Sequence, residues 1–520
     1  MNKFKKMLAS CVRSRGASSA VFTAIVLALI VFVNIIIYTL STVFPLYIYS
    51  PEEMDFSISE TTDILFSDAR RSGKKVTVTF CSYEDVVENH DTGSFVLDTA
   101  RQFAERYSDF IELRFINVYT KLDSNGNSVA EELALYEYGS NVGESEGAEG
   151  ELVKENFINT TSVIFSTETN YRVLTDYYTT AGYADFYTLD SELSITSYNG
   201  EEVFASSVMW ALREKDSQGK AYFTKGHGET ANAIMQTVLN SAGYEIMQVD
   251  LRKNDVPEDA DLLVISNPIA DFEKSAEGTA LITEYDRLKA YAKRGGNFYV
   301  VLDYYAKPLP VLESFVAEFG IKYRTDDDGV KAIIKDSANA ITADGFTLVA
   351  DYAEGELPGE MKNIIVDRTE GDGSVIMREV VALELSGNAK PILVSSSSSV
   401  LQASGATIDS EGSYVISAYS TAKNDSADDA KMFFMFDGNV TSPDAIVANG
   451  YSNRDFLYSL FDSLYGKDDM PYGCRSIVFD EQRLENLTMG TARGYTALLL
   501  AIPAALALIG TAVMIRRKNR

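Results

Sequence analysis

The sequence has few of the residues that build metal sites, disulfide frameworks or disordered tails. Its 520 residues include 3 cysteines, 2 histidines and 11 prolines. Three cysteines cannot form a disulfide framework or a cysteine-rich zinc site, and two histidines leave little for a histidine-based metal site. Because 46% of the residues are hydrophobic and 23% are charged, the disordered, collagen-like and low-complexity classes are also excluded.

Positive charge is scarce as well. Lys and Arg number 46 against 75 Asp and Glu, which gives a formal net charge of −29. Such an acidic chain repels phosphate backbones, so we expect no nucleic-acid binding. The phosphate-binding pattern G-x-x-x-x-G-K-[ST] is missing, and we therefore expect no ATP hydrolysis by this chain alone. Its length predicts about three domains.

Two long uncharged runs stand near the ends of the chain, at residues 20–40 and 495–515. Each has about 21 residues, which at about 1.5 Å per residue matches a hydrocarbon core of about 30 Å. Both runs therefore predict transmembrane helices. A cleaved signal peptide fits the first run less well, because the run is longer than a usual signal core and no small-residue cleavage site follows it.

Basic residues set the expected orientation. Five precede the first run and four follow the second, with no acid in either tail. The positive-inside rule then places both termini in the cytoplasm and residues 41–494 outside. The expected order is a tail (1–19), a transmembrane helix (20–40), a first domain (52–180), a linker with a bridging helix (181–215), a second domain (216–468), a stalk (469–494), a transmembrane helix (495–515) and a tail (516–520).

The first outside domain reads as a βαβ unit followed by a hairpin. Residues 74–80 form a β-branched run, and an apolar stripe at helical spacing follows between Val96 and Phe110. Residues 110–116 alternate as a second strand, and two short apolar runs predict the hairpin at residues 162–165 and 171–174. A helix is also expected at 131–138, before a loop at 139–150 that is rich in Gly, Glu and Ser.

The second outside domain alternates strands and helices. The strands are expected at residues 220–224, 244–249, 261–266, 297–303 and 431–436. Nearly continuous apolar strands are typical of a parallel sheet that is covered on both faces, so the fold class is predicted to be α/β. The stretch 347–417 is expected to be strand-rich, with turns at Gly355, Gly359 and Gly373.

The main candidate site is the sequence Gly226-His227-Gly228-Glu229, directly after a predicted strand. Open α/β sheets bind ligands at the carboxyl ends of their strands, where a histidine and a carboxylate serve as acid and base or as metal ligands. In the alternative interpretation, the glycines supply unusual backbone angles and Glu229 favours the following helix N-terminus. A structural or partner-binding role is favoured over catalysis, since motif matches are only hypotheses.

Three weaker candidates have simpler explanations. Cys81 ends the first strand without a C-x-x-C partner, which predicts a free or buried thiol. The acidic run at 326–329 lacks the later ligands of a calcium loop and predicts an exposed turn. Residues 395–399 are consecutive serines without a G-x-S-x-G pattern, so a nucleophile is not expected there.

Several segments follow one another along the chain in a recognisable order. They are KKVTVTF (74–80), NGEEVFASSVMWAL (199–212), YFTKGHGE (222–229) with the GHGE signature, DLLVISNPIADF (261–272), LKAYAKRGGNFYVVLD (288–303), FDGN (436–439) and NRDFLYSLFDSL (453–464). This ordered set resembles the GldG-type auxiliary proteins of gliding-motility-associated ABC transporters. The resemblance covers most of the chain, and the closing run with its RRK tail is similar too. It differs from family variants that are fused to a permease, because only two spans are expected here.

The resemblance implies a thioredoxin-like first domain without redox cysteines and a second domain like the class I glutamine amidotransferases without their nucleophile. It implies a non-catalytic accessory subunit of an ABC-2-type transport system in the cell membrane, partnered by a permease and an ATPase, with no cofactor. Ligand or partner contacts are expected at the GHGE turn and at Asp437 and Asn439. Two alternatives stay open: an envelope hydrolase with its site at the GHGE turn, and a structural protein that binds glycans through its tyrosines.

Overall fold

The computed structural model describes residues 57–118, 144–146, 152–154, 158–175, 183–189, 194–214, 218–229, 233–276, 281–369, 371–424, 428–436, 440–447 and 451–479. They all belong to the second of the two compact units into which the chain divides, residues 56–520. The predicted spans at 20–40 and 495–515 and the predicted helix at 131–138 lie outside the described residues. None of the helices in the described segments combines the length and the apolar character that crossing a bilayer requires.

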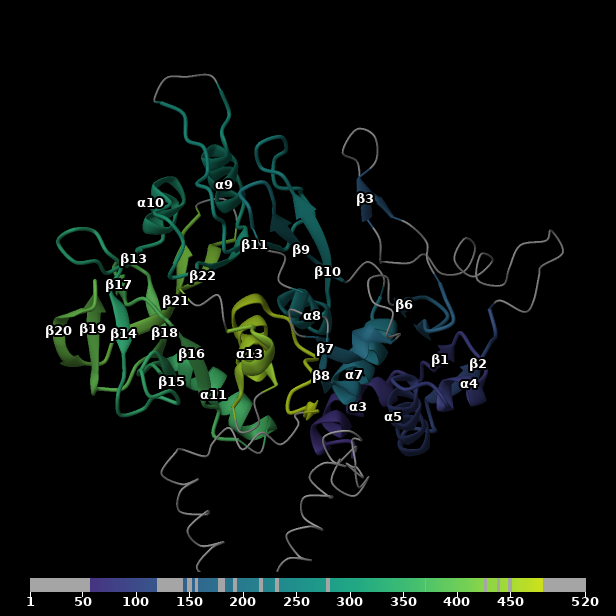
Figure 1. Cartoon of the computed structure of the whole chain (residues 1–520). Helices are drawn as coiled ribbons and strands as arrows, with labels where there is room; N and C mark the ends of the chain where they lie inside the picture. The colour runs from purple at the N-terminus through teal and green to yellow at the C-terminus, as the bar shows by residue number, and fades with distance from the viewer. Residues whose placement is uncertain are drawn as a thin grey trace, which may run out of the picture. The chain divides into compact units, whose positions relative to one another are not determined.

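The first sheet has four strands in the order β2-β1-β5-β6 (Figure 1). β1 (Val76–Phe80) pairs in parallel with β2 (Ile111–Phe115) and antiparallel with β5 (Val163–Ser166), which in turn pairs with β6 (Tyr171–Leu174). The helices α4 (Glu84–Glu88) and α5 (Gly93–Arg106) connect β1 to β2. The predicted βαβ unit and hairpin are therefore confirmed.

Residues 181–215 were expected to form a linker with a bridging helix, and the helix is present as α7 (Gly200–Leu212), but it belongs to the core of this first sheet. The Phe204 ring packs against Phe103 of α5 and Phe165 of β5, with ring centroids 5.3 and 5.1 Å apart. Val203 and Val208 are buried in the same core, which α3 (Glu60–Arg71) also covers. All residues of α7 except Glu201 and Leu212 are buried, because most of its sides are apolar.

A small three-stranded sheet joins distant parts of the chain in the order β23-β8-β7. The short helix η2 (Ala184–Phe186) precedes β7 (Tyr187–Leu189), β8 (Ile195–Tyr198) follows, and β23 (Ile477–Val478) pairs antiparallel with β8. The stalk that was expected to begin at residue 469 is therefore part of the folded body as far as Phe479. Apolar contact explains the difference, because the Phe479 ring lies 5.7 Å from Phe95 and 6.2 Å from Tyr187.

The large sheet begins with five parallel strands. Their order is β10 (Tyr244–Val249), β9 (Gly219–Thr224), β11 (Leu262–Ser266), β12 (Asn297–Val301) and β22 (Ala430–Met435). Every residue of β11 is buried, as a parallel strand with both faces covered requires. The mixed α/β class and the parallel arrangement that the apolar strands predicted are confirmed.

The same sheet continues with antiparallel strands drawn mostly from the stretch that was predicted to be strand-rich. They are β21 (Val415–Ala422), β18 (Lys390–Val394), β15 (Thr347–Tyr352) and β16 (Val375–Arg378). β17 (Leu383–Leu385) also pairs with β21, and β13 (Ile321–Tyr323) pairs with β17. Two further sheets hold β14 (Ile333–Lys335), β19 (Ser399–Ala403) and β20 (Ala406–Gly412), and β3 (Glu144–Glu146) and β4 (Leu152–Lys154).

One prediction within that stretch is wrong, because Gly359 lies inside the helix α11 (Glu356–Arg368) and not at a turn. Glu356 in the first turn and Arg368 in the last turn complement the helix dipole. A Cβ built on Gly359 would meet no atom within 4 Å. The glycine is therefore a half-buried residue inside the helix and does not mark a break in the chain.

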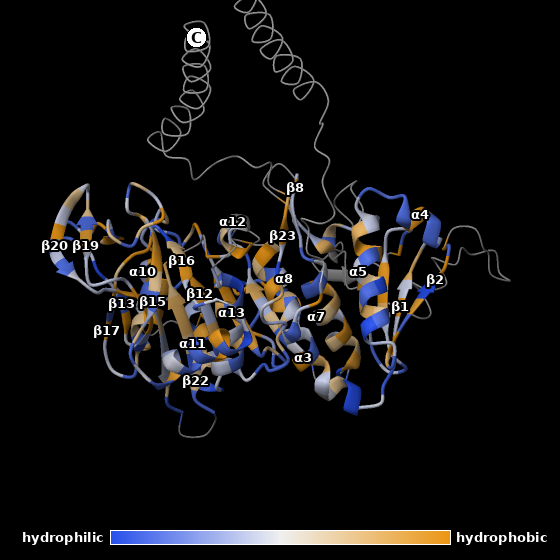
Figure 2. Ribbon diagram, turned by 90° about the horizontal axis from the view of Figure 1, so that it is seen from below, coloured by the Kyte–Doolittle hydropathy of each residue, from blue (hydrophilic) through white to orange (hydrophobic). Residues whose placement is uncertain are grey.

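Helices cover both faces of the large sheet. The residues of α8 (Ala233–Ser241), α11 and α13 (Asn453–Tyr465) contribute to the core on one face, beside the short α12 (Pro443–Ile446). The residues of α9 (Glu284–Lys293) and α10 (Pro310–Glu318) contribute to the core on the other. Figure 2 shows hydrophobic colouring concentrated on the strands and hydrophilic colouring on outer parts of helices such as α4 and α5.

Candidate functional site

The GHGE turn lies at the carboxyl end of β9, which is the point where the order of successive parallel strands in the large sheet reverses. The chain continues from β9 to β10 on one side and then crosses to β11 on the other side. Gly226 and Gly228 both have positive φ values, +111° and +74°. This backbone angle requires glycine at position 226, and a Cβ there would lie 2.4 Å from the Arg252 guanidinium carbon and displace that side chain.

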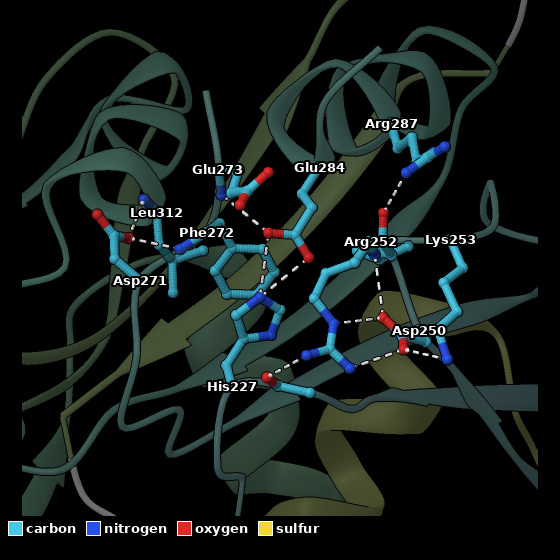
Figure 3. Close-up of polar contacts among 12 residues, drawn as sticks. His227, Asp250, Arg252, Lys253, Asp271, Phe272, Glu273, Glu284, Arg287 and Leu312 are labelled. Carbon is cyan, nitrogen blue, oxygen red and sulfur yellow. Dashed lines mark hydrogen bonds and ion pairs between the residues drawn. The ribbon is translucent and has the colours of Figure 1, made fainter. Parts of the chain in front are cut away.

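His227 lies between the carboxylates of Glu229 and Glu284, and Figure 3 shows its contact with Glu284. Its Nδ1 is 3.1 Å from Oε1 of Glu229, and its Nε2 is 2.9 and 3.1 Å from the two oxygens of Glu284. Only 4% of the His227 side chain is exposed, against 9% of Glu229 and 2% of Glu284. An imidazolium with both nitrogens protonated satisfies both carboxylates at once.

The loop after β11 encloses the ring. The backbone N–H groups of Ile269 and Ala270 donate to the His227 carbonyl at 2.8 and 2.9 Å. The Phe272 ring stacks on the imidazole with centroids 4.1 Å apart. The N–H of Glu273 donates to Oε2 of Glu284 at 2.8 Å, so the turn, this loop and the first residue of α9 are joined in one cluster.

Two flanking contacts attach this cluster to neighbouring elements. Arg252, after β10, donates to the Gly226 carbonyl at 3.1 Å and binds Asp250 with two hydrogen bonds of 2.8 and 2.7 Å. Asp271 accepts from the N–H groups of Val311 and Leu312 at 2.8 and 3.1 Å (Figure 3). The carboxylate of Asp271 thereby satisfies free N–H groups at the start of α10.

The ion pairs change the proton affinities of the cluster. Burial alone would lower the pKa of His227, but the hydrogen bonds and negative charges of Glu229 and Glu284 outweigh burial, so its pKa is raised. Burial would raise the pKa of Glu229, yet the hydrogen bonds from His227 and from backbone N–H groups lower it. The hydrogen bonds from Arg252 lower the pKa of Asp250 to about 2. Glu229 and Asp250 are therefore charged near neutral pH, and His227 keeps its proton to a higher pH than a free imidazole does.

This geometry limits what His227 can do chemically. A general acid or base needs a ring nitrogen within hydrogen-bond reach of a substrate. Both nitrogens of His227 are instead occupied by carboxylates, and the ring is covered by Phe272. The cluster is suited to fixing the backbone at the end of β9, and we name His227, Glu229 and Glu284 the His227 clamp.

The remaining candidates do not join the clamp. Asp437 and Asn439 lie outside the described residues, after the buried Phe436. Cys81 is buried, and burial raises the pKa of its thiol to about 12, so the expectation of a buried, free thiol is confirmed. Within the described part of the chain, no group of His, Cys, Asp and Glu is arranged to hold a metal ion.

The other two patterns also have structural explanations. Asp326 accepts hydrogen bonds from the N–H groups of Asp328 and Val330, at 3.0 and 2.8 Å, which closes the turn that was predicted there. In the serine run, Ser399 donates to the buried Asp336 at 3.1 Å. No histidine takes part in the contacts of that run among the described residues.

Sequence reasoning missed Glu284, Phe272 and Arg252. Glu284 lies 57 residues from His227, and only its place after Thr283, which forms a capping box with Asp286, could have marked it as the first residue of a helix. Phe272 is an apolar residue, and its sequence context predicts packing in the core as well as it predicts stacking on His227. No local signal connects either residue with His227.

No family model matches the chain, and no curated protein matches it either. Solved structures match about half of it at low similarity. The mmIFT52 N-terminal domain is 16% identical, with 47% of this chain and 96% of that chain covered and a TM-score of 0.34. A ThuA-like protein from Bacteroides uniformis is 10% identical (49% and 94% covered, TM-score 0.30), and PurLQS from Thermotoga maritima is 11% identical (47% and 98% covered, TM-score 0.26). At these TM-scores the matches carry no weight for fold or function.

Proposed function

We propose that this protein is a membrane-anchored, extracytoplasmic accessory subunit of an ABC-2-type transport system, without a catalytic centre at the GHGE turn. The observation that carries the proposal is the closed His227 clamp. The carboxyl edge of a parallel sheet is the usual place for a ligand site, but here an internal ion-pair cluster with a 4% exposed imidazole occupies it. Because both ring nitrogens of His227 are taken by carboxylates, the cluster favours a binding or coupling role for this edge of the sheet and disfavours a catalytic one.

The domain types are part of the proposal. In the first domain, a parallel pair followed by an antiparallel hairpin in the order β2-β1-β5-β6 supports a thioredoxin-like fold. Cys81 at the end of β1 has a raised thiol pKa, and a thiol that stays protonated is a poor nucleophile. In the second domain, five parallel strands with helices on both faces support an amidotransferase-like fold.

The membrane assignment depends on the two uncharged runs and their basic flanks. In this proposal a separate ATPase supplies the energy and a permease forms the path. The spans of this chain pack against the permease, while the acidic outside part captures or gates the substrate.

Purification of the full chain with its neighbours tests the proposal. The tagged chain is extracted from membranes in a mild detergent, and co-purifying proteins are identified by mass spectrometry. An ABC-type ATPase and a permease in constant ratio to the chain are expected. Their absence from preparations in which the chain itself is folded and membrane-derived would contradict the proposal.

The hydrolase alternative predicts a different result. If the His227→Gln variant kept its transport partners and transport rate but lost a measurable hydrolysis of an envelope substrate, the GHGE turn would be an active site. Under the proposal, this variant changes stability and has no hydrolytic activity to lose.

A further inference from the structure

The residues nearest the two predicted spans meet at the start of α7. On the N-terminal side, the N–H and hydroxyl of Ser59 and the hydroxyl of Thr62 all donate to Oε1 of Glu201, each at 2.7 Å. These residues follow the first uncharged run and begin α3. The carboxylate of Glu201 in α7 therefore binds the segment with which the described part of the chain begins.

The C-terminal side is held at the neighbouring residues. Ser476 donates to Oδ1 of Asn199 at 2.6 Å and accepts from Arg454 at 2.9 Å. The N–H of Phe479 donates to the Thr196 carbonyl at 2.8 Å, next to the pairing of β23 with β8. The last described residues before the second uncharged run are therefore fixed to the segment that leads into α7.

A buried ion pair links the two domains at this place. Arg454 of α13 lies 2.7 Å from Oε2 of Glu202, with only 8% and 3% of the two side chains exposed. Tyr458 also donates to Glu202. The pair joins α13 of the second domain to α7 of the first. About 250 positions of the sequence lie between the two residues.

The two ends of the described chain also touch directly. The Oγ1 of Thr62 lies 3.9 Å from the Sγ of Cys474. A Cβ built on Gly473 would lie 3.3 Å from two side-chain atoms of Thr61. We name residues 57–62, 196–202 and 473–479 together with Arg454 the junction.

We propose that the junction is the end of the body that faces the lipid bilayer, and that both membrane spans leave from it. The inference rests on the proposed function, since it takes the uncharged runs as spans. Residues 41–56 and 480–494 separate the runs from the junction, and connectors of this length reach at most about 55 Å when fully extended. Because both connectors start at the junction, each run enters the membrane within about 55 Å of it.

A new cysteine tests the junction in the full-length protein in its membrane. Thr62→Cys places a thiol opposite the native Cys474, at a separation that a small side-chain movement closes to a disulfide. Added oxidant is expected to produce a faster-migrating form on a non-reducing gel, because the bond closes most of the chain into a loop. Reductant reverses the change, and the control variant Thr62→Cys/Cys474→Ser lacks it.

Energy transfer to lipid tests which end faces the membrane. A donor dye is attached at Glu60→Cys in the junction or at Leu281→Cys beside α9, both exposed positions, with Cys11 and Cys474 replaced by serine. Figure 1 shows α3 and α9 far apart in the molecule. The vesicles carry an acceptor dye on the lipid headgroup. We expect strong energy transfer to this acceptor from a donor at position 60, and little or no transfer from a donor at position 281.

The outcomes separate this inference from the proposed function. Equal transfer from both positions, stronger transfer from position 281, or no disulfide from Thr62→Cys would overturn the inference while leaving a membrane-bound accessory subunit intact. If alkaline extraction released the full chain from membranes, the chain would have no spans, and the proposed function would fail together with the inference.

Discussion

Two buried charge clusters among the described residues differ in how far apart in the sequence their members lie. In the His227 clamp, one cation lies between Glu229, two residues away, and Glu284, 57 residues away within the same domain. In the junction, Arg454 and Glu202 come from different domains, and hydrogen bonds extend to both described ends of the chain. Both clusters are closed, but the clamp fixes one turn and the junction fixes the domains to each other.

Because the clamp fixes one turn and the junction connects two domains, the loss of a charge should have local consequences in the clamp and global consequences in the junction. A buried charge that loses its partner is costly wherever it lies. The carboxylates of the clamp keep backbone donors, because Glu229 accepts from the N–H of His227 and Glu284 accepts from that of Glu273. We therefore expect breaking the clamp to loosen one loop, and breaking the junction to weaken the whole fold.

The largest effect is expected from Arg454→Met, which leaves Glu202 buried without its cation. The free energy of unfolding should fall by about 4 kcal/mol, since breaking a buried pair costs about 3–5 kcal/mol. Urea unfolding of the detergent-solubilised full chain measures it. Arg101→Met is the matched control, because Arg101 is 38% exposed and its partners Glu84 and Glu88 are 50% and 58% exposed, so their ion pairs should be worth about 1 kcal/mol or less. Equal losses in the two variants would contradict the contrast.

A smaller loss is expected from His227→Leu. Two buried carboxylates lose their shared cation but keep their backbone hydrogen bonds, so we expect destabilisation by about 2–3 kcal/mol. Hydrogen exchange should rise first in residues 269–273 and at the start of α9, before the first domain is affected. Exchange that rises equally in both domains would show that the clamp is not local.

Gly226→Ala tests the backbone of the turn. Alanine at φ +111° and in contact with Arg252 should cost about 1–2 kcal/mol. Gly359→Ala is the matched control, since it lies in α11 with open space around its Cβ position and should stabilise the protein by up to about 1 kcal/mol. Destabilisation of the same size in both variants would refute the special role of the turn.

The smallest effect is a pH dependence of the clamp. The pKa of His227 is raised by folding, so the folded state binds the proton more tightly than the unfolded state. The stabilisation is complete below the unfolded pKa of about 6.5 and is lost as the pH rises through the higher folded pKa. The stability difference between the wild type and His227→Gln should therefore shrink from pH 6 towards alkaline pH. A difference that grows over this range would contradict the assignment of charge.

The parallel half of the large sheet was predictable because its strands are apolar over their whole length. The sequences of β11 and β12 are apolar enough to predict these strands without further information. The end of α8 was predictable too, because Gly243 has the positive φ that is favoured after the last residue of a helix. The edges of domains were not predictable in the same way. β23 has two residues, and its pairing with β8 depends on contacts of Phe479 with rings about 300 residues away or more.

The candidate site was only half predictable from the sequence. The glycines and the carboxylate of the GHGE turn are adjacent, so their relation to His227 follows from the local pattern. Glu284, the second partner of the imidazole, is brought near by the crossover between β11 and α9. Since that carboxylate completes the enclosure of the ring, the sequence alone left both the catalytic and the structural interpretation open.

Thiol labelling of whole cells tests the central claim most directly, namely that the body lies outside the membrane and the energy source inside. A membrane-impermeant maleimide is applied to cells that carry Leu281→Cys, at a position with 68% exposure, while the native Cys11 precedes the first predicted span. The proposal predicts that position 281 is labelled in intact cells and Cys11 only after permeabilisation. Labelling of Cys11 in intact cells, with position 281 protected until lysis, would contradict it.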